Sequence, residues 1–111
     1  MEIEVQQEGD VAVAAFRGSL DRLTANEALQ ALTQQVLAGH AKLVADLSGL
    51  DYISSSGLRT LLSVMKDCRA KGGDFRLAGA SPDVGKVLEL SGFTGILKTF
   101  PTRDAAVQSF A

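Results

Sequence analysis

Short apolar runs alternate with amphipathic helical patterns along the chain. Val11 to Phe16 and Leu43 to Leu47 are apolar runs typical of buried strands, and Phe75 to Ala78 predicts a further strand. The segments between these runs are long enough to form crossovers, which join parallel neighbours in a sheet. The order of the segments therefore predicts an α/β domain.

The N-terminal segment predicts an antiparallel hairpin. Ile3 and Val5 alternate with polar residues, as in a strand with one solvated face, and Gly9-Asp10 supplies a turn before Val11. With this hairpin, the sheet is mixed and has four to five strands.

Two stretches of the predicted sheet are less regular. Ser48-Gly49 is expected to break the third strand before a short segment, Leu50 to Ile53. Ile96 to Phe100 is a candidate edge strand near the C-terminus.

About four helices are predicted from capping and stop signals. Thr24 and Glu27 fit a capping box, in which each side chain satisfies a free backbone N–H, and Gly39 can end that helix. The remaining signals are a second helix from the serine cluster Ser54–Ser56 to Gly72-Gly73, a third capped by Ser81 with Pro82 first and Gly92 last, and a fourth capped by Thr102. The apolar stripes expected to face the sheet are Leu29, Leu32, Val36 and Leu37 on the first helix and Leu58, Leu61, Leu62 and Met65 on the second.

Composition narrows the function classes. The 111 residues suffice for one domain, residues 1–111, and the 46% hydrophobic content predicts an independent core. Eleven basic and thirteen acidic residues give a net charge of -2, which argues against a nucleic-acid partner. One cysteine, no leader segment and no apolar stretch of roughly 20 residues predict a cytoplasmic protein without membrane insertion.

The sequence offers little to a catalytic mechanism. One histidine and one cysteine cannot form a conventional zinc site, and no glycine-rich phosphate loop occurs. A serine nucleophile would need His40 as its base from another part of the chain. We therefore expect no metal, no cofactor and no enzymatic activity.

The serine cluster is the most informative chemical feature. Ser54, Ser55 and Ser56 precede an apolar helix and Gly57 keeps its first turn bare. A helix N-terminus has unpaired N–H groups and a partial positive charge, so it tolerates an added phosphate. The simpler interpretation is that one serine is only an N-cap, but three consecutive hydroxyls exceed what capping requires.

The segment around this cluster resembles a known family. Residues 46–59 read DLSGLDYISSSGLR, which is similar to the central signature of STAS domains in bacterial anti-sigma-factor antagonists. The similarity extends to Gly18–Asp21, Gly72-Gly73 and Ser91–Phe93, and so covers almost the whole chain. It implies a STAS-type fold.

The resemblance also implies roles for single residues. The serine two positions before the glycine is the family's phosphoacceptor, which is Ser55 here, with Ser56 and Ser54 as secondary candidates. Ser54 stands where antagonists often carry aspartate, which leaves the partner and the phosphorylation rate open. Asp21 is expected beside the serine loop, and the partner-binding set comprises Asp21, Ser54, Ser56, Gly57 and Arg59.

By this resemblance, the unphosphorylated protein binds a cognate anti-sigma factor and thereby releases a sigma factor. The anti-sigma factor is commonly also a serine kinase that uses ATP, and a serine phosphatase restores the active form. Two alternatives stay open: an accessory STAS subunit that docks on the ATPase of an ABC-type lipid transporter, and a nucleotide or anion sensor at the Ser55 helix terminus.

Several polar residues have simpler interpretations. Asp46 either orients the loop hydroxyls or caps the turn after its strand, and Asp21 is either a partner contact or a turn residue. Asp51 and His40 are expected at the surface, and Cys68 in the core. Arg59 and Lys66 line either a partner face or a solvated face.

Overall fold

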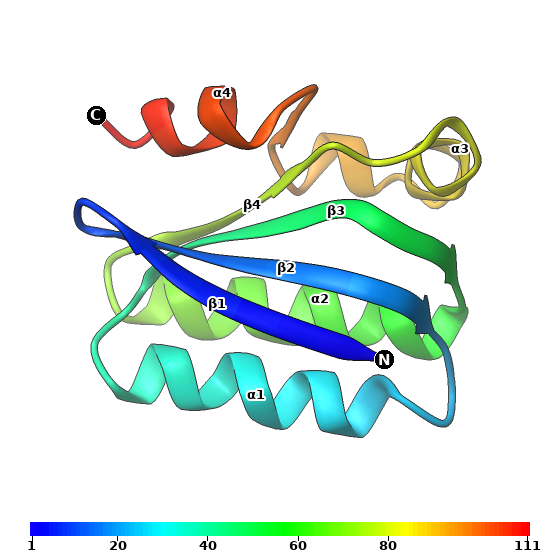
Figure 1. Ribbon diagram of the computed structural model, residues 1–111, viewed down its shortest axis with the longest axis horizontal. Helices are drawn as coiled ribbons and strands as arrows, with labels where there is room; N and C mark the ends of the chain where they lie inside the picture. The colour runs from blue at the N-terminus through cyan, green and yellow to red at the C-terminus, as the bar shows by residue number, and fades with distance from the viewer.

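A computed structural model of residues 1–111 places a sheet between two layers of helices (Figure 1). The strands are β1 (Glu2–Glu8), β2 (Val11–Leu20), β3 (Lys42–Ile53), β4 (Asp74–Ala78) and β5 (Thr99–Phe100), and they follow this order across the sheet. β1 is antiparallel to β2, and every other pair of neighbours is parallel. The predicted mixed α/β sheet and its N-terminal hairpin are confirmed.

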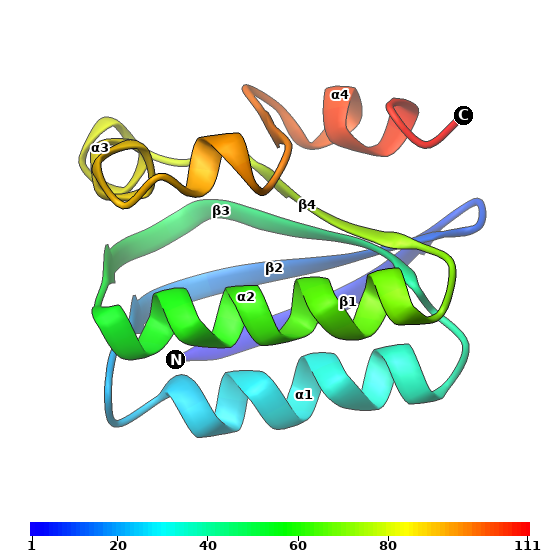
Figure 2. The same ribbon diagram turned by 180° about the vertical axis from the view of Figure 1, so that it is seen from behind.

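The helices divide between the two faces of the sheet. α1 (Ala25–Leu37) and α2 (Ser55–Ala70) lie side by side on one face (Figure 2). The other face carries α3 (Pro82–Leu90), the 3-10 helix η1 (Phe93–Gly95) and α4 (Arg103–Gln108). Both α1 and α2 begin at the end of the molecule where β2 and β3 finish (Figure 1).

The apolar runs are buried because the sheet is covered on both faces. In β2, Ala12 and Ala14 belong to the larger hydrophobic cluster, which includes residues of α1 and α2, while Val11 and Val13 belong to a smaller cluster under α4. Alternate side chains of a strand point to opposite faces, so a run covered on both sides is apolar at every position.

Cys68 lies in the larger cluster and is fully buried, as predicted. Burial raises the pKa of its thiol to about 12, and the negative charges of Asp67 and Asp74 contribute to the rise. The prediction that Leu37 belongs to the apolar stripe of the first helix is wrong, because Leu37 is 72% exposed at the end of α1.

The predicted break at Ser48-Gly49 is also wrong, because β3 continues through it. Ala15 pairs with Asp46 and Arg17 with Gly49, so β3 accommodates one extra residue as an irregularity in the ladder. A Cβ atom at Gly49 would lie 2.7 Å from the Phe16 carbonyl oxygen. The glycine therefore permits the close approach of β2 and does not end the strand.

The C-terminal edge strand is shorter than predicted. Only Thr99 and Phe100 pair with β4, whereas the N–H groups of Ile96 and Leu97 donate to the Phe93 carbonyl oxygen. These two donors are used locally and cannot extend the ladder. The predicted caps of α3 and α4 are confirmed, since Ser81 and Thr102 each accept a hydrogen bond from the N–H three residues later.

Candidate functional site

The serine loop joins the end of β3 to the start of α2, at the carboxyl ends of two parallel strands. Ser54 is the N-cap of α2, and its Oγ accepts a hydrogen bond from the Gly57 N–H at 3.2 Å. Its own N–H donates to the Leu20 carbonyl oxygen at 2.9 Å, which ties the loop to the end of β2. Ligand and partner sites of parallel sheets commonly form at this edge.

The three hydroxyl groups of the cluster have different surroundings. The Ser54 Oγ caps the helix, and the Ser56 Oγ accepts a hydrogen bond from Arg59 Nη2 at 3.3 Å. Ser55 is the first residue of α2, is exposed, and has no hydrogen bond from its side chain to the rest of the protein. Ser55 is therefore the serine of this cluster whose hydroxyl is both accessible and unengaged.

Gly57 is buried, so it does not present a surface to a partner. A Cβ atom there would lie 2.8 Å from the Leu20 carbonyl oxygen and 2.9 Å from Ile53 Cγ1. The glycine lets the first turn of α2 pack directly against the ends of β2 and β3, and thereby sets the position of the serines.

Asp21 organises the turn between β2 and α1. Its Oδ1 accepts hydrogen bonds from the Leu23 N–H at 2.9 Å and the Thr24 N–H at 3.1 Å, and its carbonyl oxygen accepts from the Ala25 N–H at 2.8 Å. These contacts are those of a turn residue. Because the Leu20 carbonyl oxygen accepts a hydrogen bond from Ser54, the turn that Asp21 organises follows directly on the residue that contacts the serine loop.

The capping box predicted at Thr24 is absent, although α1 begins where expected. Thr24 is the N-cap residue, but its Oγ1 accepts from the Asp21 N–H at 3.0 Å and donates to the Ser19 carbonyl oxygen at 2.8 Å. The hydroxyl is thus turned toward the preceding strand and not toward the N–H groups of the helix.

The Asp46 carboxylate has its hydrogen-bond and charge partners outside the Ser54–Ser56 cluster. Its Oδ1 accepts from the Ser48 N–H at 3.0 Å within the continuous strand β3, so it caps no turn, and its Oδ2 lies 3.7 Å from Arg103 Nε at the start of α4. Those groups, and not the serine hydroxyls, surround Asp46. Asp51 is exposed, as expected.

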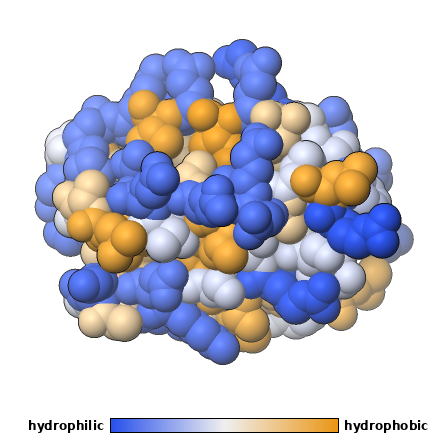
Figure 3. Space-filling model, turned by 90° about the horizontal axis from the view of Figure 1, so that it is seen from below, coloured by the Kyte–Doolittle hydropathy of each residue, from blue (hydrophilic) through white to orange (hydrophobic).

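A groove runs between the first turns of α1 and α2. It has a volume of about 270 Å³. Ser56, Arg59 and Thr60 line it from α2, and Arg22 lines it from the turn between β2 and α1. Figure 3 views this helical face, on which hydrophilic side chains surround separate hydrophobic patches. Arg22 was not predicted as a site residue, because nothing in the sequence near Asp21 indicates that it lines a groove with residues of α2.

His40 is remote from this site. It follows α1, whose 13 residues make a helix about 20 Å long, and the start of that helix shares the groove with Ser56. The His40 Nδ1 instead lies 2.8 Å from Gln35 Oε1, and the residue is half-buried. His40 is therefore not placed to act as a base for Ser55.

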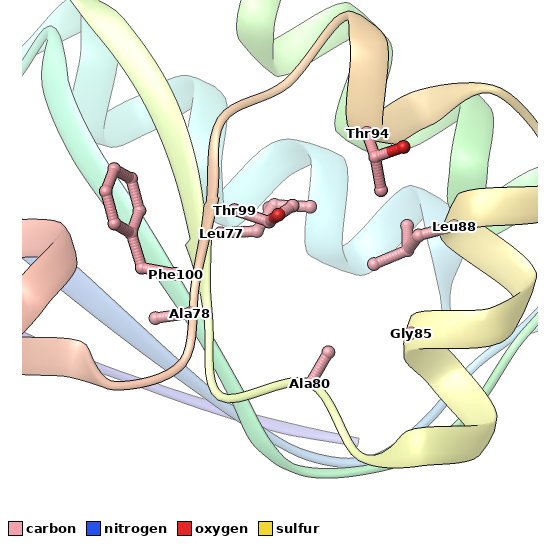
Figure 4. Close-up of a pocket in the computed structure, with 8 residues that line it drawn as sticks. All are labelled: Leu77, Ala78, Ala80, Gly85, Leu88, Thr94, Thr99 and Phe100. Atoms are coloured by element: carbon pink, nitrogen blue, oxygen red, sulfur yellow. The ribbon is translucent and has the colours of Figure 1, made fainter.

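A second cavity lies on the opposite face of the sheet (Figure 4). Its volume is about 190 Å³, below the roughly 300–1,000 Å³ typical of ligand pockets. It is lined by Leu77, Ala78, Ala80, Gly85, Leu88, Thr94, Thr99 and Phe100, which include no ionisable side chain. None of the predicted site residues lines it.

Two further properties concern the whole chain. No three His, Cys, Asp or Glu side chains gather where they could hold a metal ion. None of the helices combines the length and the apolar character needed to cross a membrane.

Comparison with known proteins identifies the family. The family model for the STAS domain matches residues 2–106. The chain belongs to the STAS domain family. This family assignment agrees with the α/β fold and with the position of the serine loop at the start of α2.

Similar STAS proteins are antagonists of anti-sigma factors. BtrV of Bordetella bronchiseptica, named as a candidate anti-sigma factor antagonist, is 34% identical over 110 residues, which cover 99% of this chain and 95% of BtrV. The crystal structure of an anti-sigma factor antagonist from Mycobacterium paratuberculosis superposes with a TM-score of 0.90 at 26% identity, and covers 98% of this chain and 92% of that one.

The fold is also that of the anti-sigma factor antagonist SpoIIAA. Its unphosphorylated form has a TM-score of 0.82 at 21% identity and covers 97% of this chain and 95% of that one. Its phosphorylated form has a TM-score of 0.75 at 20% identity and covers 99% of this chain and the whole of that one. The named functions of these relatives favour an antagonist over the transporter-subunit alternative.

Proposed function

We propose that this STAS domain is an anti-sigma-factor antagonist switched by phosphorylation of Ser55. The observation that carries the proposal is the exposed Ser55 hydroxyl, which no protein group engages, at the start of α2. The names of the relatives support the class of partner, an anti-sigma factor. In this mechanism, the unphosphorylated domain binds the anti-sigma factor, and a sigma factor is released.

The other two serines are poorer acceptors because their hydroxyls have structural partners. Modification of Ser54 would disturb the cap on the Gly57 N–H, and loss of such a cap costs about 0.5–2 kcal/mol. Modification of Ser56 would first have to break its hydrogen bond with Arg59. A kinase meets neither obstacle at Ser55.

The chemistry of the switch belongs to the partner. A serine kinase transfers the γ-phosphoryl group of ATP to Ser55 Oγ, the hydroxyl proton passes to a base of the kinase, and ADP is released. A serine phosphatase reverses the modification by hydrolysis. In this proposal the STAS domain itself is a binding protein and performs no catalysis.

The domain is expected to stay folded when phosphorylated. The phosphate adds a charge of about -1.5 to -2 at the positive end of the α2 dipole, and the first turn of this helix has no acidic residue to repel it. The existence of a phosphorylated SpoIIAA structure shows that the same fold in that protein accommodates the group. The switch therefore acts at the surface that the partner meets.

The decisive experiment is phosphopeptide mapping after reaction with the kinase captured from the native lysate. We expect phosphate on Ser55, none after Ser55→Ala, and unchanged modification after Ser63→Ala, an exposed serine two turns further along α2. Capture by the Ser55→Ala protein should recover a small ATP-binding anti-sigma factor. Recovery of a transporter ATPase, or phosphate confined to Ser54 or Ser56, would contradict the proposal.

A further inference from the structure

Two of the arginines of this protein form no ion pair with a carboxylate. The chain has six arginines, and four of them lie within 4.0 Å of a carboxylate oxygen: Arg17 with Glu4, Arg69 and Arg76 with Asp74, and Arg103 with Glu8 and Asp46. Arg22 and Arg59 have no such partner, and both are exposed. They line the same groove beside the serine loop, and no Asp or Glu lines that groove.

Arg59 is already directed toward the first turn of α2. It lies four residues after Ser55, and residues at this spacing are neighbours on one side of a helix. Its Nη2 donates to Ser56 Oγ at 3.3 Å, so the guanidinium reaches back along the helix as far as Ser56, the residue next to Ser55. Arg22 approaches the same groove from the turn that follows β2.

We propose that Arg59, together with Arg22, binds the phosphate group of phosphorylated Ser55. The inference rests on the proposed function, because it concerns the regulation of the same serine. A phosphate offers three acceptor oxygens, and guanidinium groups bind such oxygens in two-point, charge-assisted contacts. These contacts are stronger than the single long hydrogen bond to a neutral hydroxyl that Arg59 makes in the unmodified protein.

The arrangement gives the modification a second effect. The phosphate engages the two arginines that otherwise have no carboxylate partner, and draws them across the groove between α1 and α2. A partner then loses access to these cations as well as to the Ser55 hydroxyl. The phosphorylated surface thus differs from the unmodified one over the groove and not only at one side chain.

The test uses the full chain with phosphoserine encoded at position 55, so that it needs neither kinase nor partner. The readout is the second pKa of the phosphate, followed by ³¹P NMR, which is about 6 for an ordinary phosphoserine. We expect a pKa below that value, because the arginines favour the dianion. Arg59→Ala should raise it by about half a pH unit, the size of one exposed ionic contact.

Two variants separate a specific contact from general electrostatics. Lys66→Ala removes an exposed cation from the same helix, eleven positions from Ser55, and should leave the phosphate pKa unchanged. Arg59→Lys keeps the charge without the planar two-point geometry and should give an intermediate value. Arg22→Ala should give a smaller rise than Arg59→Ala. The nearby carboxylates along the chain, Asp21 and Asp51, are the same in every variant.

Equal pKa values in the Arg59→Ala and Lys66→Ala proteins would overturn the inference. No effect of Arg22→Ala would remove Arg22 from it. The phosphate pKa tests the inference separately from the proposed function, because a phosphate bound by Arg59 is detected whether or not the domain binds an anti-sigma factor. Conversely, if phosphorylation of Ser55 controls partner binding but Arg59→Ala leaves the phosphate pKa unchanged, the proposed function stands and only the binding of the phosphate by the arginines is contradicted.

Discussion

Helices α2 and α3 both have a serine as N-cap, and each follows a parallel strand of the sheet. The Ser54 Oγ accepts from the Gly57 N–H and the Ser81 Oγ from the Val84 N–H, each at 3.2 Å. Each first turn also contains a glycine, Gly57 or Gly85. The two caps are therefore equivalent as hydrogen-bonded structures.

The residues after the caps make the two helix starts chemically different. α3 continues with Pro82, which has no hydroxyl, and Asp83, whose carboxylate suits the positive end of the helix. α2 continues with Ser55 and Ser56, and its first turn has no acidic residue. The comparison teaches that a capping serine is not in itself a modification site. The side chain after the cap supplies the exposed hydroxyl.

The largest expected effect concerns partner binding at the α2 start. Phosphoserine at position 55 should lower the affinity for the anti-sigma factor by somewhat over a hundredfold, corresponding to about 3 kcal/mol of desolvation and repulsion. Ser55→Asp should weaken binding less, since one carboxylate carries less charge than a phosphate. Calorimetric titration measures both.

The matched control for that experiment is Pro82→Asp at the first position of α3. It places a negative charge at the corresponding point of the other helix and should leave the affinity unchanged. An equal loss of affinity in this variant would mean that the partner surface includes both helix starts, and the comparison would fail.

Replacing the glycine of each first turn by alanine should change the free energy of unfolding in opposite directions at α2 and α3. Gly57→Ala should lower the free energy of unfolding by about 1–3 kcal/mol, because its Cβ would lie 2.8 Å from the Leu20 carbonyl oxygen. At Gly85 no atom outside the adjoining residues and the helix's own backbone lies within 4 Å of a Cβ, so Gly85→Ala should raise the free energy of unfolding by about 0.5–1 kcal/mol. Urea denaturation distinguishes the opposite signs, and a stabilising Gly57→Ala would refute the packing argument.

The capping serines should behave alike, in contrast to the glycines. Ser54→Ala and Ser81→Ala should each cost about 1 kcal/mol of unfolding free energy, through the same lost hydrogen bond. Ser55→Ala serves as the control and should change stability by no more than about 0.5 kcal/mol. A larger cost for Ser55→Ala than for Ser54→Ala would indicate that the hydroxyls have been assigned to the wrong roles.

The smallest effect is expected for the alkylation of native Cys68, which is fully buried at the other end of α2. With its pKa raised from 9.0 to about 12, the thiol should not react with an alkylating reagent at pH 8 until the protein unfolds. Since the folded state retains this proton more strongly, the associated stability is present below about pH 9 and is lost as pH rises toward 12. Mass spectrometry of native and denatured samples measures the alkylation.

Much of the fold could be predicted because local signals and burial agree. The buried strands, the caps at Ser81 and Thr102 and the core position of Cys68 were predicted from their sequence patterns. Two predictions were wrong because the local pattern did not include the strand or turn that lies against the residue. At Thr24 the Ser19 carbonyl oxygen and the Asp21 N–H claim the hydroxyl, and at Gly49 the approach of β2 requires the absence of a side chain.

By itself, the sequence determined the alternation of strands and helices, the serine-rich start of the second helix and the resemblance to STAS domains. These properties follow from periodicity, capping chemistry and motif spacing, which act over a few neighbouring residues. Only the tertiary structure decided which hydroxyl is free and that Arg22 and Arg59 line one groove. The physical reason is that sequence patterns do not give side-chain directions: the hydroxyls of Ser54 and Ser56 bond to groups three residues further along α2, which leaves Ser55 free, while the packing of α1 beside α2 brings Arg22 to the groove that Arg59 lines.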